Sequence, residues 1–262
     1  MRTMPTLMLS LVLATPAVAA DGVLEINQTC ALQGGCFAGD AAGFPVTITT
    51  TGSYRLTGNL TIPDETTTAI VVSASGSTLD LGGFEIHGPN TCAGSPLTCT
   101  LTGTGFGVQL TGSRVRILNG AVTGVGGVGI YGPATPTTGE GHVVEDVRVS
   151  NNRFEGIRLD GDGTHVRQVT AISNGGIGVR LEGVGSVVAE SVITKNALTG
   201  VLLGSLCTAQ GNQIISNGQL GLWSLGTGTI FRDNSIAGNL TGAVVGGVVN
   251  AGGNVCSPGN CP

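Results

Sequence analysis

The chain has 262 residues, of which 46 are glycine, while charged residues make up only 10% and aromatic residues 3%. Sixteen acidic against eleven basic residues give a net charge of −5, which argues against a nucleic-acid partner. Abundant glycine excludes a helical bundle, and a mean hydropathy of +0.33 excludes intrinsic disorder. We therefore expect a soluble protein rich in strands and turns.

Residues 1–20 have the pattern of a secretory signal peptide. Arg2 precedes the apolar segment Leu7–Ala14, and the small residues at 17–20 provide a cleavage site. The apolar segment is too short to span a membrane, and no other stretch reaches about 18 apolar residues. We therefore predict a secreted or periplasmic protein without a membrane span, and we expect it to be a monomer.

All seven cysteines follow the predicted signal peptide. Six of them fall into close pairs, which are Cys30 and Cys36, Cys92 and Cys99, and Cys256 and Cys261. Export favours disulfides, and the spacings lack the CxxC pairs of zinc sites, although the sequence leaves the connectivity open. The remaining Cys207 is expected to be a buried free thiol, because no catalytic motif surrounds it.

A repeat of about 22 residues dominates the chain after its first hundred residues. Glycine followed by alternating apolar positions recurs at Gly107, Gly129, Gly156, Gly178, Gly200, Gly221 and Gly242. Five of these glycines follow an asparagine by three or four residues, namely Asn152, Asn174, Asn196, Asn217 and Asn239. The alternation predicts short strands, and one repeat of this length fits one coil of a parallel β-helix with coils about 4.8 Å apart.

In such a fold the inward aliphatic residues would stack into a core, and asparagine would serve the turns. Asparagine tolerates the left-handed conformation and can form an amide ladder along the axis. Leucine-rich repeats would need leucine-rich convex segments, a left-handed hexapeptide helix would repeat near 18 residues, and calcium-binding nonapeptide repeats need more than the single Gly161–Gly163 motif. A right-handed parallel β-helix is the preferred fold.

Three early segments carry a resemblance to a known group. Gly52–Leu60, Ala69–Val72 and Ser77–Gly88 resemble the opening coils of exported right-handed parallel β-helix proteins of the pectin-lyase-like superfamily. The resemblance extends over nearly the whole chain after the signal peptide and implies the all-β solenoid. It does not fix an activity, because the superfamily includes polysaccharide lyases, hydrolases, epimerases and adhesins.

The expected organisation has three parts after the signal peptide. Residues 21–56 would form an N-terminal cap, residues 57–250 the coils, and residues 251–262 a C-terminal cap closed by a disulfide. Two insertions would interrupt the coils, at 88–105 and at 133–139.

The second residue after each repeat glycine is expected to point outward from one sheet. This column reads Gln109, Tyr131, Arg158, Arg180, Leu202, Trp223 and Val244, and the next outward positions in two coils are Asp160 and Glu182. Four rungs, about 19 Å, separate Tyr131 from Trp223, which suits a short oligosaccharide. We predict a carbohydrate-binding face at Tyr131, Arg158, Arg180 and Trp223, because aromatic rings stack on sugars and arginine binds carboxylates.

The partner would be a polysaccharide or a cell-surface glycan. The competing interpretation is a solvated sheet on which arginines and carboxylates merely balance charge, in a structural or adhesin-like protein.

Catalysis is the less favoured interpretation of the same residues. Asp160 and Glu182 on adjacent coils could approach the carboxylate separation of glycosidases. However, neighbouring arginines favour ionised carboxylates, whereas a general acid must hold its proton. The resemblance to lyases would add Arg180 as a base and Ca²⁺ at Asp160, Asp162 and Glu182, but the further acidic ligands of such a site are not found.

The sequence therefore leaves open whether the protein is a polysaccharide lyase, a glycoside hydrolase or no enzyme. The Asp-Asp and Gly-His-Gly motifs of polygalacturonases are missing, and the three histidines are scattered. His142 closes the 133–139 insertion, and His165 is expected to be a surface turn residue.

Overall fold

The computed structural model describes residues 22–100, 102–134, 139–257 and 261–262. The predicted signal peptide, residues 1–20, and residues 135–138 of the predicted insertion lie outside these ranges. Within the described ranges, no helix is long and apolar enough to cross a membrane.

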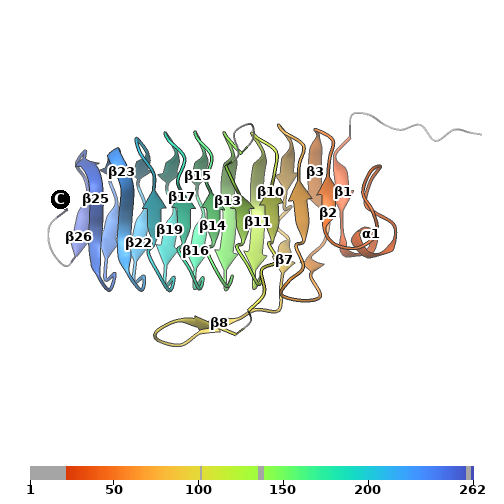
Figure 1. Cartoon of the computed structure of the whole chain (residues 1–262), viewed down its shortest axis with the longest axis horizontal. Helices are drawn as coiled ribbons and strands as arrows, with labels where there is room; N and C mark the ends of the chain where they lie inside the picture. Colours follow the sequence, from red (N-terminus) through yellow and green to blue (C-terminus); the bar gives the residue numbers. More distant parts are fainter. Residues whose placement is uncertain (1–21, 101, 135–138, 258–260) are drawn as a thin grey trace, which may run out of the picture.

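Three parallel sheets wind around one apolar core, and the coils stack along a single axis (Figure 1). Sheet I contains β2 (Val46–Ile48), β5 (Ile70–Val72), β10 (Val108–Leu110), β12 (Ile130–Gly132), β14 (Ile157–Leu159), β17 (Val179–Leu181), β20 (Val201–Leu203) and the first parts of β23 (Leu220–Arg232) and β25 (Gly242–Asn250).

Sheets II and III complete each coil. Sheet II contains β1 (Leu24–Ile26), β3 (Ser53–Leu56), β6 (Thr78–Asp80), the first parts of β11 (Arg116–Thr123) and β13 (Val143–Ser150), β15 (His165–Arg167), β18 (Val187–Ala189), β21 (Thr208–Gln210) and the ends of β23 and β25. Sheet III contains β4 (Leu60–Thr61), β7 (Glu85–His87), the ends of β11 and β13, β16 (Thr170–Ile172), β19 (Val192–Thr194), β22 (Gln213–Ile215), β24 (Ser235–Ala237) and β26 (Val255–Ser257).

The pairing between successive coils confirms the predicted parallel β-helix. Ile157 pairs with Val179, and Val179 pairs with Val201, all in parallel register and all fully buried. The alternation of buried and partly exposed residues in these three-residue strands is the period of two that the sequence showed. Stacked aliphatic side chains therefore form one continuous core along the axis.

The predicted asparagine ladder is present at the corner between sheets III and I. Asn174 Nδ2 donates to Asn196 Oδ1 at 2.9 Å, and Asn196 repeats this bond to Asn217 at 3.0 Å. The left-handed residue of this corner is not the ladder asparagine, as we expected, but the residue before it, such as Ser173 or Lys195. The asparagine instead turns inward, where its amide meets the next coil.

A second ladder, not predicted from the sequence, lies at the corner between sheets II and III. Asn212 Nδ2 donates to Asn234 Oδ1 at 3.0 Å, and Asn234 donates to Asn254 at 2.9 Å. It begins late in the chain, so fewer coils repeat it.

The repeat glycines are required by close approach of the next coil. A Cβ atom on Gly178 would lie 2.7 Å from both Asn196 Nδ2 and the carbonyl oxygen of Gly200. Each repeat glycine therefore packs against the ladder asparagine of the next coil, which explains why the two residue types recur together.

The N-terminal end of the core is covered by the segment after β1. The helix α1 (Gln28–Gln33) is capped by Asn27, whose side chain accepts a hydrogen bond from Cys30 N, and it buries Ala31. Behind it, the rings of Phe37 and Tyr54 meet edge to face at 4.9 Å, and a disulfide joins Cys30 to Cys36. Figure 1 shows α1 beyond the first rungs at this end.

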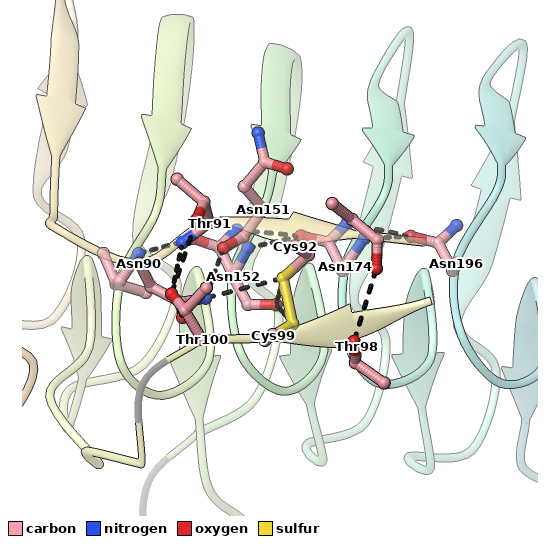
Figure 2. Close-up of a disulfide and its surroundings, with 12 residues drawn as sticks. Asn90, Thr91, Cys92, Thr98, Cys99, Thr100, Asn151, Asn152, Asn174 and Asn196 are labelled. Atoms are coloured by element: carbon pink, nitrogen blue, oxygen red, sulfur yellow. Dashed lines mark hydrogen bonds between the residues drawn. A yellow bond between two sulfur atoms is a disulfide. The ribbon is translucent and has the colours of Figure 1, made fainter. Parts of the chain in front are cut away.

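The insertion at 88–105 forms a hairpin that lies over the asparagine corner (Figure 2). Its strands β8 (Cys92–Ala93) and β9 (Thr98–Cys99) pair antiparallel, and a disulfide joins Cys92 to Cys99. Asn90 Nδ2 donates to the carbonyl oxygen of Asn151 at 2.7 Å. A Cβ atom on Gly175 would meet the sulfur of Cys99, so the disulfide packs directly on the corner backbone.

The remaining cysteines also agree with the sequence interpretation. A third disulfide joins Cys256, on β26, to Cys261. Cys207 is a free, buried thiol, and burial raises its pKa, which keeps it protonated and unreactive.

Candidate functional site

The outward column of sheet I has the predicted register through most of its length. Tyr131 pairs with Arg158, Arg158 with Arg180, and Arg180 with Leu202, which in turn pairs with Trp223. The side chains of Tyr131 and Trp223 therefore lie four rungs apart on one face, about 19 Å at the spacing of β-strands. Leu202 between them is almost completely buried, so the column is not uniformly exposed.

The last residue of the predicted column is wrong by one position. Trp223 pairs with Val245, whereas Val244 pairs with Leu222 and packs against the core. Ala243, not Gly242, takes the place of the repeat glycine opposite Gly221. Alanine is tolerated there because no further ladder asparagine stacks on it within the described residues.

Tyr131 belongs to an aromatic pair that sequence reasoning missed. The ring of Phe106 stacks on the ring of Tyr131, with centroids 4.7 Å apart and an interplanar angle of 27°. Phe106 follows the 88–105 insertion and lies two residues before β10, so the segment that leaves the insertion supports the face. The guanidinium carbon of Arg158 lies 5.6 Å from the ring centroid of Tyr131, within cation–π distance.

Both arginines are held by carboxylates of the same face. Arg158 Nε donates to both oxygens of Asp160, at 3.2 and 3.1 Å, and its Nη2 lies 3.1 Å from Oδ2. Burial disfavours the charge of Arg158, but the hydrogen bond and charge of Asp160, with the charge of Glu155, outweigh it and raise the pKa of Arg158. The guanidinium is therefore permanently charged and fixed in orientation.

Arg180 is bound by two carboxylates, of which the sequence indicated one. Its Nε donates to Glu182 Oε1 at 3.0 Å, and its Nη1 lies 3.4 Å from Glu155 Oε1. Glu155 precedes the repeat glycine of the coil before, and its side chain is largely buried. The sequence did not predict this contact, because the position before the repeat glycine is not regularly acidic. In the next coil it is the apolar Ile177.

The structure does not gather the predicted calcium ligands. Asp160 faces Arg158, Glu182 faces Arg180, and Asp162 Oδ1 accepts a hydrogen bond from Val184 N at 2.8 Å. Among the described residues, no group of three or more His, Cys, Asp or Glu side chains is arranged to hold a metal ion.

Sheet II carries an ion cluster of the same kind, and among the described residues no aromatic ring stacks on its arginines. Glu145 Oε2 lies 2.7 Å from Arg116 Nη2 and 3.0 Å from Arg167 Nη2. The hydrogen bonds from Arg116 and Arg167 lower the pKa of Glu145. The two arginines are about half exposed, against about a quarter to a third for Arg158 and Arg180. This cluster on sheet II is therefore the comparison for the one on sheet I, because it shows how the chain pairs arginines with a carboxylate on a solvent-exposed sheet.

His142 is fully buried, whereas His87 and His165 are exposed. His87 ends β7, and His165 begins β15 instead of lying in a turn as the sequence suggested. His142 Nδ1 accepts a weak hydrogen bond from Val115 N at 3.3 Å, and His142 Nε2 has no hydrogen-bond partner within the described ranges. Burial lowers the pKa of His142 to about 4. His142 lies at the corner between sheets I and II, beside Gly132 and Val115.

Comparison with known proteins agrees with this architecture. The sequence model of the right-handed β-helix region matches residues 47–240. The chain belongs to the right-handed β-helix family. No curated protein is significantly similar to this β-helix in sequence.

Solved structures share the fold of this β-helix at low sequence identity. The structure of the pectate lyase Pel9A is 16% identical, with a TM-score of 0.52, and the match covers 76% of this chain and 59% of the lyase. The Agl-KA catalytic domain is 15% identical, with a TM-score of 0.53, and the match covers 77% of this chain and 38% of that domain. The chain thus spans three fifths or less of each structure, and at these identities the likeness concerns the fold.

Proposed function

We propose that this β-helix binds a glycan on the outer face of sheet I and does not cleave it. The observation that carries the proposal is the Tyr131 ring, backed by Phe106 and lying in register beside Arg158 and Arg180. Together they form a strip of aromatic and hydrogen-bonding groups along the axis, with which the apolar and hydroxyl sides of a sugar can make contact. Trp223 extends the strip in the C-terminal direction.

The ion pairs support binding over cleavage. A glycosidase acid must hold a proton at neutral pH, which requires an environment that disfavours its charge. Asp160, Glu155 and Glu182 instead each contact a permanently charged arginine. In this arrangement the carboxylates serve to hold the guanidinium groups and to accept hydrogen bonds from sugar hydroxyls.

The same contacts favour a neutral glycan over an acidic one. Two arginines against three carboxylates, Asp160, Glu155 and Glu182, leave the cluster with one net negative charge. The guanidinium edges that would bind a uronate already bind these carboxylates. The carboxylates would therefore repel the carboxylate of an acidic sugar, and that sugar would have to displace an existing ion pair to reach an arginine. Neutral hydroxyls can bond to the outer oxygens without displacing any pair.

Two further observations agree with a glycan partner met outside the cytoplasm. A pectate lyase shares the fold, and three disulfides suit an oxidising compartment. We propose on this basis that the protein is exported.

The test is calorimetric titration of the full oxidised chain with neutral and uronate oligosaccharides of four to eight sugars, followed by analysis for new chain ends. We expect binding of a neutral oligosaccharide without cleavage. Tyr131→Ala should weaken it about tenfold, equivalent to about 1.4 kcal/mol, and Arg158→Ala with Arg180→Ala should weaken it at least as much.

The control is the double variant Arg116→Ala with Arg167→Ala, which removes the same charge from sheet II. It should bind as the unaltered chain does. If both double variants lose glycan affinity equally, the effect is one of net charge, and a site on sheet I is refuted. New chain ends in the glycan would refute the proposal that the protein does not cleave it.

A structural or adhesin-like solenoid is the second candidate function. The Arg116–Glu145–Arg167 cluster favours it, because sheet II shows that this chain builds arginine–carboxylate groups without aromatic partners. If no neutral or acidic glycan binds, sheet I is a second example of the same charge balance, and this alternative stands.

A further inference from the structure

A cleft separates the hairpin insertion from the corner that joins sheets III and I. The cleft has a volume of about 600 Å³, which lies within the range of small-molecule sites. Hairpin residues 92–97 form one wall, and the left-handed corner residues Ser173, Lys195 and Ser216 of three successive coils line the other, together with Leu240. Figure 2 shows the hairpin lying beside the ladder asparagines of this corner. The described lining of the cleft shares no residue with the outer face of sheet I.

The corner wall carries polar groups that the protein leaves unused. Ser173, Lys195 and Ser216 occupy equivalent positions in neighbouring coils, so they stand in one column with about 4.8 Å between rungs. Within the described residues, the side chains of all three make no hydrogen bond and no ion pair. The ladder asparagines next to them are, in contrast, bonded to both neighbouring coils, as Asn196 shows. The column therefore offers a donor on each of three rungs.

The cleft is positive, although the chain as a whole is negative. Lys195 is the only charged residue among the described residues that line it, and the insertion 88–105 contains none. Arg153, on the coil before Ser173, adds positive charge beside the hairpin, where its Nη1 donates to the carbonyl oxygen of Gly103 at 3.2 Å. Because no carboxylate of the described lining neutralises Lys195, an anion is the ligand that this wall favours. A single lysine matches one negative charge, whereas a phosphate dianion is usually bound by several arginines.

The hairpin wall is apolar in its side chains. Of residues 92–97, only Ser95 carries a side-chain hydroxyl, while Ala93, Pro96 and Leu97 are hydrocarbon. Sugar hydroxyls turned toward this wall would lose water without gaining side-chain partners, whereas an alkyl or aryl group would be favourably removed from water. The two walls together suit a ligand that is anionic on one side and apolar on the other.

We propose that this cleft binds a small organic acid that has an apolar body. The carboxylate accepts hydrogen bonds from the ammonium group of Lys195 and from the hydroxyl of Ser173 or Ser216, one rung to either side. The apolar body lies against Pro96 and Leu97 of the hairpin. This second site is independent of glycan binding, because the outer face of sheet I lies outside the cleft.

The test is a titration of the full oxidised chain, followed by the backbone amide signals of its NMR spectrum. The probe is octanoate, and acetate and octanamide serve as matched ligands that lack the apolar body or the charge. We expect octanoate to bind with a Kd of about 1 mM or tighter and to shift the amide signals of Leu97, Ser173, Lys195 and Ser216. Acetate and octanamide should each bind at least about fivefold more weakly.

Three variants and a control separate the charge of Lys195 from the apolar hairpin wall. Lys195→Gln should weaken octanoate binding about fivefold, and Lys195→Arg should retain it, because the carboxylate needs the positive charge. Leu97→Ser should weaken octanoate binding about threefold and leave acetate binding unchanged, since only octanoate has an apolar body. The matched control is Arg148→Gln, which removes an equal charge from an exposed arginine outside the cleft that makes no ion pair within the described residues. This control should bind octanoate as the unaltered chain does.

The NMR spectrum of each variant without ligand shows whether it is folded. Equal binding of octanoate and either matched ligand, or equal weakening by Lys195→Gln and Arg148→Gln, would overturn the proposal. Amide shifts confined to other parts of the chain, or no binding at about 10 mM octanoate, would overturn it as well.

Discussion

The buried corner between sheets III and I and the outer face of sheet I are adjacent in every coil, yet they use polar side chains in opposite ways. At the corner, Asn174 and Asn196 are buried. The backbone nitrogen and the side-chain nitrogen of each donate to Oδ1 of the ladder asparagine in the next coil. On the outer face, Arg158 and Arg180 bond to carboxylates of the surface and stay partly open to solvent. The corner asparagine recurs from the coil of Asn152 to that of Asn239, whereas the residue on the outer face changes from coil to coil.

This difference separates the residues that explain the fold from those that point to function. A buried amide without its partners is costly, so the ladder, once begun at Asn152, continues in each following coil to Asn239. The fold places no such demand on the outer face, where Tyr131 gives way to arginine and arginine to leucine within three rungs. The outer face is therefore where a binding site can arise without loss of stability.

Removing one ladder amide should have the largest effect on stability. Asn196 donates to Asn217 Oδ1 and to the carbonyl oxygen of Ala171, and it accepts from Asn174. Asn196→Ala would leave these buried groups unpaired, and we expect a loss of about 2–4 kcal/mol in the free energy of unfolding by urea titration.

The control for this change is Asn59→Ala. Asn59 is exposed and accepts one hydrogen bond from Glu85 N, so its loss should be below about 1 kcal/mol. Equal losses for the two variants would mean that the ladder does not bear the stability assigned to it.

His142 should make the buried interior sensitive to acid, with an effect somewhat smaller than that of the ladder. Its pKa is lowered to about 4 by burial, below the ordinary value of 6.5. Above pH 6.5 both states are neutral and the histidine contributes no pH dependence. Between pH 6.5 and 4 only the unfolded chain takes up the proton, so the free energy of unfolding falls, by about 3 kcal/mol over the whole window.

Urea titrations at pH 7 and pH 4.5 measure this contribution. The loss on acidification should be about 2–3 kcal/mol greater in the unaltered chain than in His142→Leu, which cannot titrate. His165→Gln, at an exposed strand position, should behave as the unaltered chain does. A His142→Leu variant with an unchanged acid response would contradict the assignment of the burial effect to this residue.

The periodic sequence predicted the coils, the ladder and most of the outward column because each is enforced once per turn. Contacts that occur only once escaped it. Phe106 reaches Tyr131 from the segment that follows an insertion, and Glu155 reaches Arg180 from the preceding coil, so neither contact belongs to the repeat. His142 was placed at an insertion by its neighbours, although its side chain enters the core. The predicted outward column is wrong at Val244, where Val245 stands instead, because alanine replaces the repeat glycine in the last coil.

The smallest effect on stability is expected on the outer face itself. Arg180 is about one quarter exposed and contacts Glu182 and Glu155, so Arg180→Ala should lower the free energy of unfolding by about 1 kcal/mol or less once solvent screening is counted. Arg114→Ala breaks a pair that is 66% and 62% exposed, with Glu140, and should leave unfolding unchanged within about 0.5 kcal/mol. Urea titration measures both. If Arg180→Ala costs as much as Asn196→Ala, the outer cluster is part of the scaffold, and its arginines are then explained by the fold without any ligand. A small loss combined with weakened glycan binding would instead assign those arginines to recognition.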